Sequence, residues 1–195
     1  YNKNLIKAED LPKTIFELTD PKWKGKLGWA PRNASFQSHV TAMIKVWGKE
    51  KTATWLKGLK NNQIKDYPKN TPIVKAVASG KIPAGLVNHY YLYKVRKDTE
   101  YSEQAKVVEN HFFDDGDAGM FVNISGVAIL KSSKKKELAQ RFVNYLLSEA
   151  GQNSFKTVNF EYPVRKGVDA IESLKPLSEI NPIKVDLGDL DKVEE

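Results

Sequence analysis

Short apolar runs alternate with helical patterns in the first half of the chain, and this alternation limits the possible folds more than any other feature. Residues 26–30, 64–67 and 84–87 have the composition of short strands, and a helical pattern follows each of them. Strands that alternate with helices form sheets whose neighbours run parallel. The alternation therefore predicts an α/β fold with a substantially parallel sheet.

Apolar spacing and cap residues set the expected bounds of the other elements. Helices are expected over residues 36–47, 51–59, 70–80, from about 90, over 134–148 and over 152–157. Further strands are expected over 107–113 and 120–130, and the tail from residue 166 is expected to be irregular with one short helix.

Polar residues occupy each strand-to-helix connection. Asn33 and Ser35 precede the first helix, Asn70 opens the second, and Asn88 precedes the third. Ligands of such sheets bind at the carboxyl ends of the strands, so the connections are expected to converge on one cleft. Capping accounts for each residue taken singly. Taken together, at helix N-termini whose N–H groups favour anions, they predict an anion site.

Two adjacent tyrosines, Tyr90 and Tyr91, follow the strand over residues 84–87 directly. Aromatic residues are ordinary in strands and cores, but here the strand has just ended at the polar Asn88. Both phenols should therefore face the cleft. A phenolate is a hard oxygen donor, and hard donors suit hard cations. Ferric ion is the hard cation that best matches this pair.

Composition excludes several classes of function. A chain of 195 residues with 41% hydrophobic residues can form one large domain or two small lobes. It contains no cysteine, which removes disulfides, thiolate metal sites and cysteine nucleophiles. The net charge of +7 is spread along the chain, and its sharpest cluster, residues 131–136, is interpreted as a solvated helix start rather than a nucleic-acid site. The chain lacks an initiator Met, a signal-peptide pattern and a bilayer-length apolar run, so we expect a fragment or a processed product.

Several motifs in a fixed order resemble one family over nearly the whole chain. They lie at residues 20–25, 55–60, 88–91, 125–133 and 161–164. The sequence is similar there to the bacterial ferric-ion-binding proteins, the substrate-binding components of ABC iron importers. The resemblance implies a type II periplasmic-binding-protein-like lobe, with a mixed sheet flanked by helices, plus an incomplete portion of the second lobe of that fold.

The resemblance also implies a division of the chain. Residues 1–118 would form the C-terminal lobe, residues 119–165 would belong to the N-terminal lobe, and residues 166–195 would pack back on the C-terminal lobe. The first part of the N-terminal lobe would precede Tyr1. Residues 119–165 would then expose apolar surface and an unpaired strand edge, and could pair with another copy of the chain.

For the site, the resemblance implies Tyr90 and Tyr91 as metal ligands. It places a small synergistic anion, phosphate or carbonate, on an anion site formed by Asn33, Ala34, Ser35, Asn70 and Asn88. Some family members carry a further tyrosine in the loop that corresponds to residues 32–36, and this chain has none there. Because the remaining ligands of the family come from the missing lobe, we expect ferric affinity to fall severely in this chain.

The expected function is extracytoplasmic capture of ferric ion, in the periplasm or on a cell-surface lipoprotein, and delivery to an ABC permease in the membrane. An alternative is a binding protein of the same fold that takes an organic anion or phosphate without metal. An enzyme or regulatory domain is disfavoured, because paired carboxylates or an activated nucleophile are missing from the pattern. His39, His89 and His111 are interpreted as structural or surface residues, with a hydrogen bond behind the ligands as the functional alternative for His89.

Overall fold

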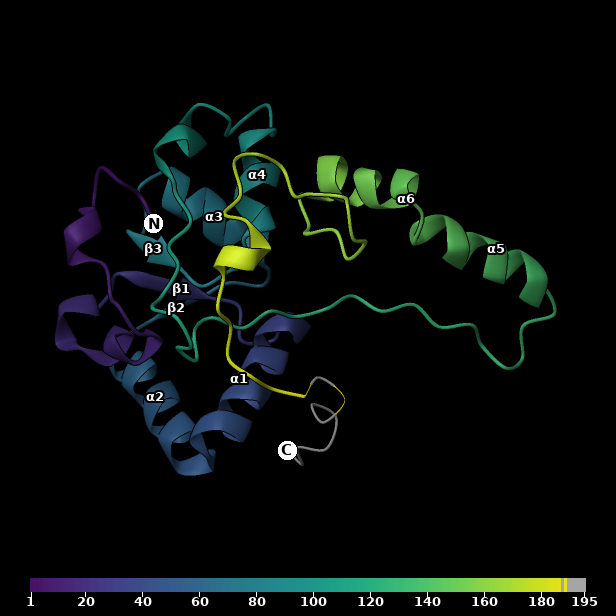
Figure 1. Cartoon of the computed structure of the whole chain (residues 1–195). Helices are drawn as coiled ribbons and strands as arrows, with labels where there is room; N and C mark the ends of the chain where they lie inside the picture. The colour runs from purple at the N-terminus through teal and green to yellow at the C-terminus, as the bar shows by residue number, and fades with distance from the viewer. Residues whose placement is uncertain (187, 189–195) are drawn as a thin grey trace. The chain divides into compact units, whose positions relative to one another are not determined.

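The computed structural model describes residues 1–186 and residue 188, and these fall into two compact units (Figure 1). Unit 1 comprises Tyr1–Asn123 together with the described residues from Asn181 onward, and unit 2 comprises Ile124–Ile180. The boundaries expected from the sequence lay after residues 118 and 165. The assignment of either unit to a lobe of the family fold stays a prediction.

A parallel sheet lies at the centre of unit 1. Its strands are β1 (Leu27–Trp29), β2 (Lys65–Asp66) and β3 (Ala84–Gly85), in the order β2-β1-β3. Gly28 pairs with Lys65 on one side and with Gly85 on the other. All three strands were expected from the sequence. Antiparallel pairing between described residues is limited to an isolated bridge between Asn2 and Val108.

Four α-helices of unit 1 follow from the same alternation of elements. They are α1 (Ala34–Trp47), α2 (Lys49–Asn61), α3 (Asn70–Ala78) and α4 (Tyr90–Arg96). Gly48 ends α1 with a φ of 83°, a conformation that glycine adopts without a steric penalty, and it also begins α2. Short 3-10 helices occupy Ala8–Asp10, Ile15–Thr19, Pro21–Trp23 and Gln104–Val107.

The helices bury two hydrophobic clusters, which belong to different helix pairs. One cluster takes Met43 from α1 and Trp55 and Leu59 from α2, and the other takes Ile73 from α3 and Leu92 from α4. Figure 1 shows β1 lying between the two pairs. Unit 1 is therefore a three-layer α/β/α arrangement, with the connections between strands and helices at the edges of the layers.

Glycines allow α3 and Ile82, which follows it, to lie directly on the sheet. A Cβ atom on Gly85 of β3 would come within 2.2 Å of Ile73 Cγ2, and one on Gly28 of β1 within 2.6 Å of Ile82 Cδ1. Neither position has room for a side chain. The close approach of helix to strand fixes where the N-terminus of α3 lies beside the ends of the strands.

Unit 2 consists of α5 (Lys136–Leu146), α6 (Glu149–Ser154), a π-helical turn (Phe155–Asn159) and a 3-10 turn (Leu177–Glu179). Among the described residues, α5 buries none of its own side chains, and Leu138, Phe142 and Tyr145 are all more than half exposed. The segment before α5 is also apolar and exposed, with Leu130 at 71%. The apolar exposure that the sequence analysis anticipated for residues 119–165 is therefore present.

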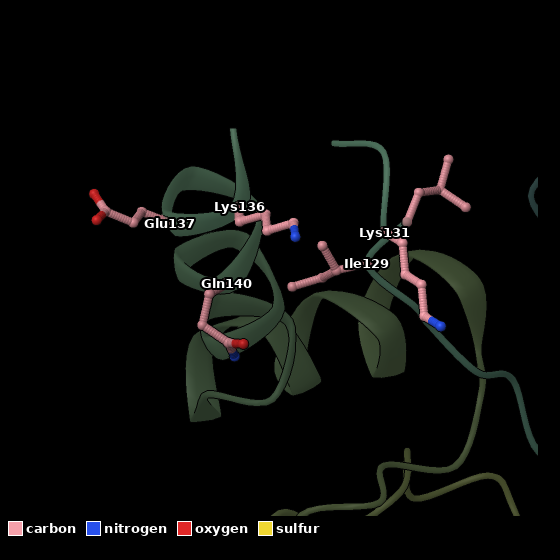
Figure 2. Close-up of a pocket in the computed structure, with 6 residues that line it drawn as sticks. Ile129, Lys131, Lys136, Glu137 and Gln140 are labelled. Atoms are coloured by element: carbon pink, nitrogen blue, oxygen red, sulfur yellow. The ribbon is translucent and has the colours of Figure 1, made fainter. Parts of the chain in front are cut away.

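An open hollow lies in unit 2 between α5 and the segment that precedes it. Figure 2 shows Ile129 and Lys131 on the segment, and Lys136, Glu137 and Gln140 on the helix. Glu137 is the single carboxylate among the six lining residues. One carboxylate offers few of the oxygen ligands that a bound cation needs. No helix in the described part of the chain is long and apolar enough to cross a membrane.

Two strands expected from the sequence are wrong. Residues 107–113 hold the end of a 3-10 helix and an extended run that pairs only at Val108, and residues 120–130 form no ladder with any described residue. The residue types that favour strands do so because they fit a half-buried pleated surface. Their presence does not show that a partner strand is available. Both segments are extended or irregular because backbone partners for a ladder are missing there among the described residues.

Candidate functional site

The three strand-to-helix connections of unit 1 meet through a network of amide and hydroxyl side chains. Asn88 Oδ1 accepts a hydrogen bond of 2.8 Å from Ser35 Oγ and one of 2.9 Å from Asn70 Nδ2. These residues follow β1, β2 and β3, which run parallel and end at one edge of the sheet. The convergence expected from the sequence is therefore present, and Asn88 is its hub.

The start of α1 is capped from within this network. Asn33 is the N-cap, and its side-chain oxygen accepts a hydrogen bond of 3.0 Å from Ser35 N. Ser35 Oγ lies 2.5 Å from the same oxygen, so its one proton is shared between Asn33 and Asn88. The first N–H groups of a helix lack intrahelical partners, so the N–H groups of Ala34 and Phe36 remain available to a ligand.

The start of α3 has a different arrangement. Its N-cap, Lys69, makes no side-chain cap hydrogen bond, and Pro72 at the third position has no N–H to give. The N–H groups of Asn70 and Thr71 therefore point from the helix end without an intrahelical partner. The Asn70 side chain is itself 4% exposed and fixed by Asn88, so the helix start is firmly placed.

Tyr90 and Tyr91 form the first turn of α4, two and three residues after the hub Asn88. Their ring centroids lie 4.5 Å apart with planes tilted by 34°, and both side chains are half-buried. Tyr91 N donates a hydrogen bond of 3.2 Å to Asn88 O, which ties the pair to the network. Tyr91 also packs against the cluster formed by α3 and α4.

Lys94 is a neighbour of the tyrosine pair that the sequence analysis missed. Its ammonium lies 4.9 Å from the ring centroid of Tyr90 and 5.7 Å from that of Tyr91. The signal was available in the sequence, because residues three and four positions apart share one face of a helix. An ammonium at these distances interacts favourably with the negative faces of both rings.

Two of the three histidines contact backbone carbonyls, and the third lies beside the tyrosine pair. His39 Nε2 lies 2.6 Å from Ala118 O and His111 Nε2 lies 2.7 Å from Pro12 O, which are structural contacts. Burial lowers the pKa of His39, although the Ala118 carbonyl and Asp117 favour its protonated form. His89 stands at the N-cap of α4 with its ring edge-on to Tyr90 at 5.5 Å.

Carboxylate and imidazole donors do not gather anywhere in the described residues. No group of three His, Asp or Glu side chains, the usual ligands of a hard or borderline metal, lies close enough together there to hold an ion. At the ends of the strands, Asp66 closes β2 and accepts a hydrogen bond from Trp29 Nε1, and Tyr90 and Tyr91 supply two phenols side by side. The two phenols are the adjacent pair of oxygen donors at this edge of unit 1.

Sequence comparisons match the chain to a family of solute-binding proteins and to relatives named as ferric iron-binding proteins. The family model described as bacterial extracellular solute-binding protein matches residues 1–186. The Fe(3+)-binding periplasmic protein of Serratia marcescens is 35% identical over 191 residues, which are 97% of this chain and 56% of that protein. The major ferric iron-binding protein of Neisseria meningitidis serogroup B is 35% identical over 185 residues, covering 95% of this chain and 55% of that protein.

Solved structures agree with the sequence matches. Iron-bound HitA from Pseudomonas aeruginosa superposes with a TM-score of 0.88 at 39% identity, over 97% of this chain and 60% of that one. The Trichodesmium IdiA (FutA) protein in complex with iron and citrate has a TM-score of 0.83 at 33% identity, over 98% of this chain and 62% of that one. The type II periplasmic-binding-protein fold expected from the sequence is confirmed.

The matches cover nearly all of this chain but only part of each relative. The chain spans little more than half the length of the curated relatives it matches, although nearly all of it is matched. The match to the family model runs without a break through both compact units. The chain therefore belongs to the bacterial extracellular solute-binding protein family.

Proposed function

We propose that this chain takes part in extracytoplasmic binding of ferric ion together with a small anion, and in its delivery to an ABC permease. The observation that carries the proposal is the tyrosine pair on the first turn of α4, joined through Asn88 to the starts of α1 and α3. The iron-binding proteins of Serratia and Neisseria are relatives over almost the whole chain.

The tyrosines supply the metal donors. Tyr90 and Tyr91 present two phenols side by side, and a bound cation favours loss of their protons, so metal binding releases protons and strengthens as pH rises. Two phenolates occupy only part of the coordination shell of a ferric ion. The anion and groups outside this chain would fill the rest, so the chain by itself binds ferric ion more weakly than a full-length relative.

The anion, phosphate or carbonate, would lie where the starts of α1 and α3 meet. Ala34 offers its backbone N–H, Asn33 and Ser35 shape the start of α1, and Asn70 and Asn88 offer side chains. Helix N-termini stabilise negative charge, and the anion offsets part of the charge of the metal. Binding rather than catalysis is the role of such a site.

The exposed apolar face of unit 2 fits the remainder of this proposal. Leu138, Phe142 and Tyr145 on α5 need a cover, because an apolar face of this kind rarely stays in water. For this chain by itself we assign that cover to a second copy. The protein would act outside the cytoplasm, in the periplasm or on a lipoprotein at the cell surface.

A visible absorption spectrum tests the metal assignment. Ferric ion added with citrate, carbonate or phosphate should give a tyrosinate-to-iron band, and Tyr90→Phe and Tyr91→Phe should each weaken or abolish it. Tyr93→Phe on the same helix is the matched control and should keep the band. If the wild-type chain gives no band with any of the three anions, even at ferric concentrations high enough to offset its weaker affinity, the metal assignment is wrong. Calorimetric binding of phosphate in that case would favour the alternative, an anion-binding protein without metal.

A further inference from the structure

The helix that carries the tyrosine pair, α4, is only seven residues long. A helix of that length is not stable in water by itself, so its position depends on the contacts around it. Leu92 and Val95 pack into the hydrophobic cluster that α4 shares with α3. Apolar contacts have no preferred direction, so they do not by themselves set the rotation of α4 about its axis.

Residues 105–110 supply directional contacts at both ends of α4, and we call this segment the brace. At the N-terminal end, Asn110 Nδ2 donates a hydrogen bond of 3.2 Å to His89 O, the carbonyl directly before Tyr90. A carbonyl oxygen has two lone pairs, so it can accept this bond as well as the first bond of the helix. Asn110 therefore fixes the turn that carries the tyrosine pair.

Arg96 fastens the other end of α4 to the same segment. Its guanidinium donates from Nη2 to Val108 O at 2.6 Å and from Nε to Ala105 O at 3.4 Å. Nη2 also lies 3.1 Å from Glu109 Oε1, and the arginine side chain is 28% exposed. The donors of a planar guanidinium stand at fixed angles, so these contacts set the orientation of the helix end as well as its position.

Asn2 fixes the brace to the rest of unit 1. It is 3% exposed and forms the isolated antiparallel bridge with Val108. Its Nδ2 donates a hydrogen bond of 2.9 Å to Val77 O of α3, and its backbone N donates one of 2.9 Å to Pro83 O, directly before β3. The brace, α3 and β3 therefore form one frame, to which α4 is fastened at both ends.

From this geometry, and resting on the proposed function, we propose that Asn110 and Arg96 are positioning residues for the ferric site. They hold α4 at the rotation at which Tyr90 and Tyr91 bind the metal together. Consecutive residues project about 100° apart around a helix axis. A small rotation of α4 therefore brings one phenol oxygen closer to a shared metal and moves the other away.

Two measurements test the proposal, one without metal and one with it. Without metal, Asn110→Ala should make the amide N–H groups of α4 exchange with solvent roughly fivefold faster, because loss of a hydrogen bond favours opening of the helix. With ferric ion and the anion that gives the strongest tyrosinate band, the variant should bind roughly tenfold more weakly. The absorption maximum of the band should also shift, because the geometry of the two phenolates has changed.

Arg96→Lys is the second variant, since it keeps the positive charge but loses the fork that reaches two carbonyls. It should repeat the faster exchange of α4 and the shifted band. Asn110→Ser, which keeps a short polar side chain, replaces Asn110→Ala if that variant does not fold.

Asn62→Ala separates positioning from a loss of stability alone. Asn62 is 5% exposed, and its Nδ2 donates hydrogen bonds of 3.0 Å to Leu18 O and 2.8 Å to Asp20 O, at the end of α2. Its replacement should destabilise unit 1 without shifting the tyrosinate band, and any faster exchange should not be confined to α4.

The outcomes distinguish this inference from the proposed function. An unshifted band with unchanged affinity in Asn110→Ala and Arg96→Lys would overturn the inference and leave ferric binding intact. An equal shift in Asn62→Ala would overturn it as well, since any loss of stability would then suffice. The absence of a band from wild type at high ferric concentration would instead overturn the proposed function, and this inference with it.

Discussion

At the scale of single residues, the site depends on the hydrogen bonds of one side-chain amide, that of Asn88. Asn88 Oδ1 accepts hydrogen bonds from Ser35 and from the buried Asn70, and so couples three separate connections. A buried polar group left without a partner costs more than a hydrogen bond gains when it forms. The hub therefore matters for the stability of unit 1 as well as for any ligand.

Asn88→Ala should lower the free energy of unfolding by about 1–3 kcal/mol, because Asn70 Nδ2 would lose its acceptor inside the protein. Urea unfolding followed by tryptophan fluorescence measures the change. Asn61→Ala, at the exposed end of α2, is the matched control and should change little. Equal losses for the two variants would show that the network adds nothing to stability.

Much of the candidate site was predictable at this scale. The sequence placed Asn33, Ser35, Asn70 and Asn88 at helix starts, and parallel topology implied that those starts meet. The roles of Tyr90 and Tyr91 as ligands stay a prediction that rests on the family resemblance. The hydrogen-bond pattern could not be predicted, because it depends on side-chain positions that packing decides.

At the scale of elements, the position of α3 against the sheet decides where the anion subsite lies. Gly85 lets Ile73 lie directly against β3, and the first turn of α3 follows from that contact. Cores are packed as densely as crystals, so even one methyl group at such a contact forces a shift.

Gly85→Ala should destabilise unit 1 by about 1–3 kcal/mol, because its Cβ would lie 2.2 Å from Ile73 Cγ2. Gly126→Ala is the matched control, since a Cβ atom there meets nothing within 4 Å. Thermal unfolding of both variants measures the difference. A Gly85→Ala protein as stable as the control variant would mean that α3 can move away from the sheet without cost.

The elements also show where sequence patterns stop being informative. The helix from residue 36 and the strands near 28, 65 and 85 were expected and are present. Residues 107–113 and 120–130 have equally good strand composition but form no ladder among the described residues. A helix satisfies its own backbone groups, whereas a strand needs a partner that composition cannot supply.

At the scale of the whole molecule, the chain divides into a unit whose helices bury two hydrophobic clusters and a unit that buries few apolar side chains, Phe160 and Leu174 among them. The helices of unit 1 bury Met43, Trp55, Ile73 and Leu92, whereas α5 of unit 2 buries none of the residues that the structure describes there. Most of the stability of a helix comes from packing its apolar face. The apolar face of α5 therefore needs a cover.

If a second copy provides that cover, Leu138→Glu with Phe142→Glu should shift the chain from dimer towards monomer. Charges on that face cannot be buried without a large cost. Sedimentation velocity over a range of concentrations measures the shift. The control, Gln140→Glu with Asn144→Glu, adds the same charge to exposed polar positions of α5 and should leave association unchanged. A wild-type chain that stays monomeric at every concentration would exclude the second copy as the cover.

The sequence by itself determined the order of strands and helices in unit 1, the polar starts of α1 and α3, and the adjacency of Tyr90 and Tyr91. These features are local, because helix caps and side-chain periodicity depend on neighbours within a few residues. Only the tertiary structure decided that Asn88 joins the three connections, that Lys94 lies over both rings, and that residues 120–130 form no strand ladder with any described residue. Each of these depends on groups brought together by packing, which no local pattern records.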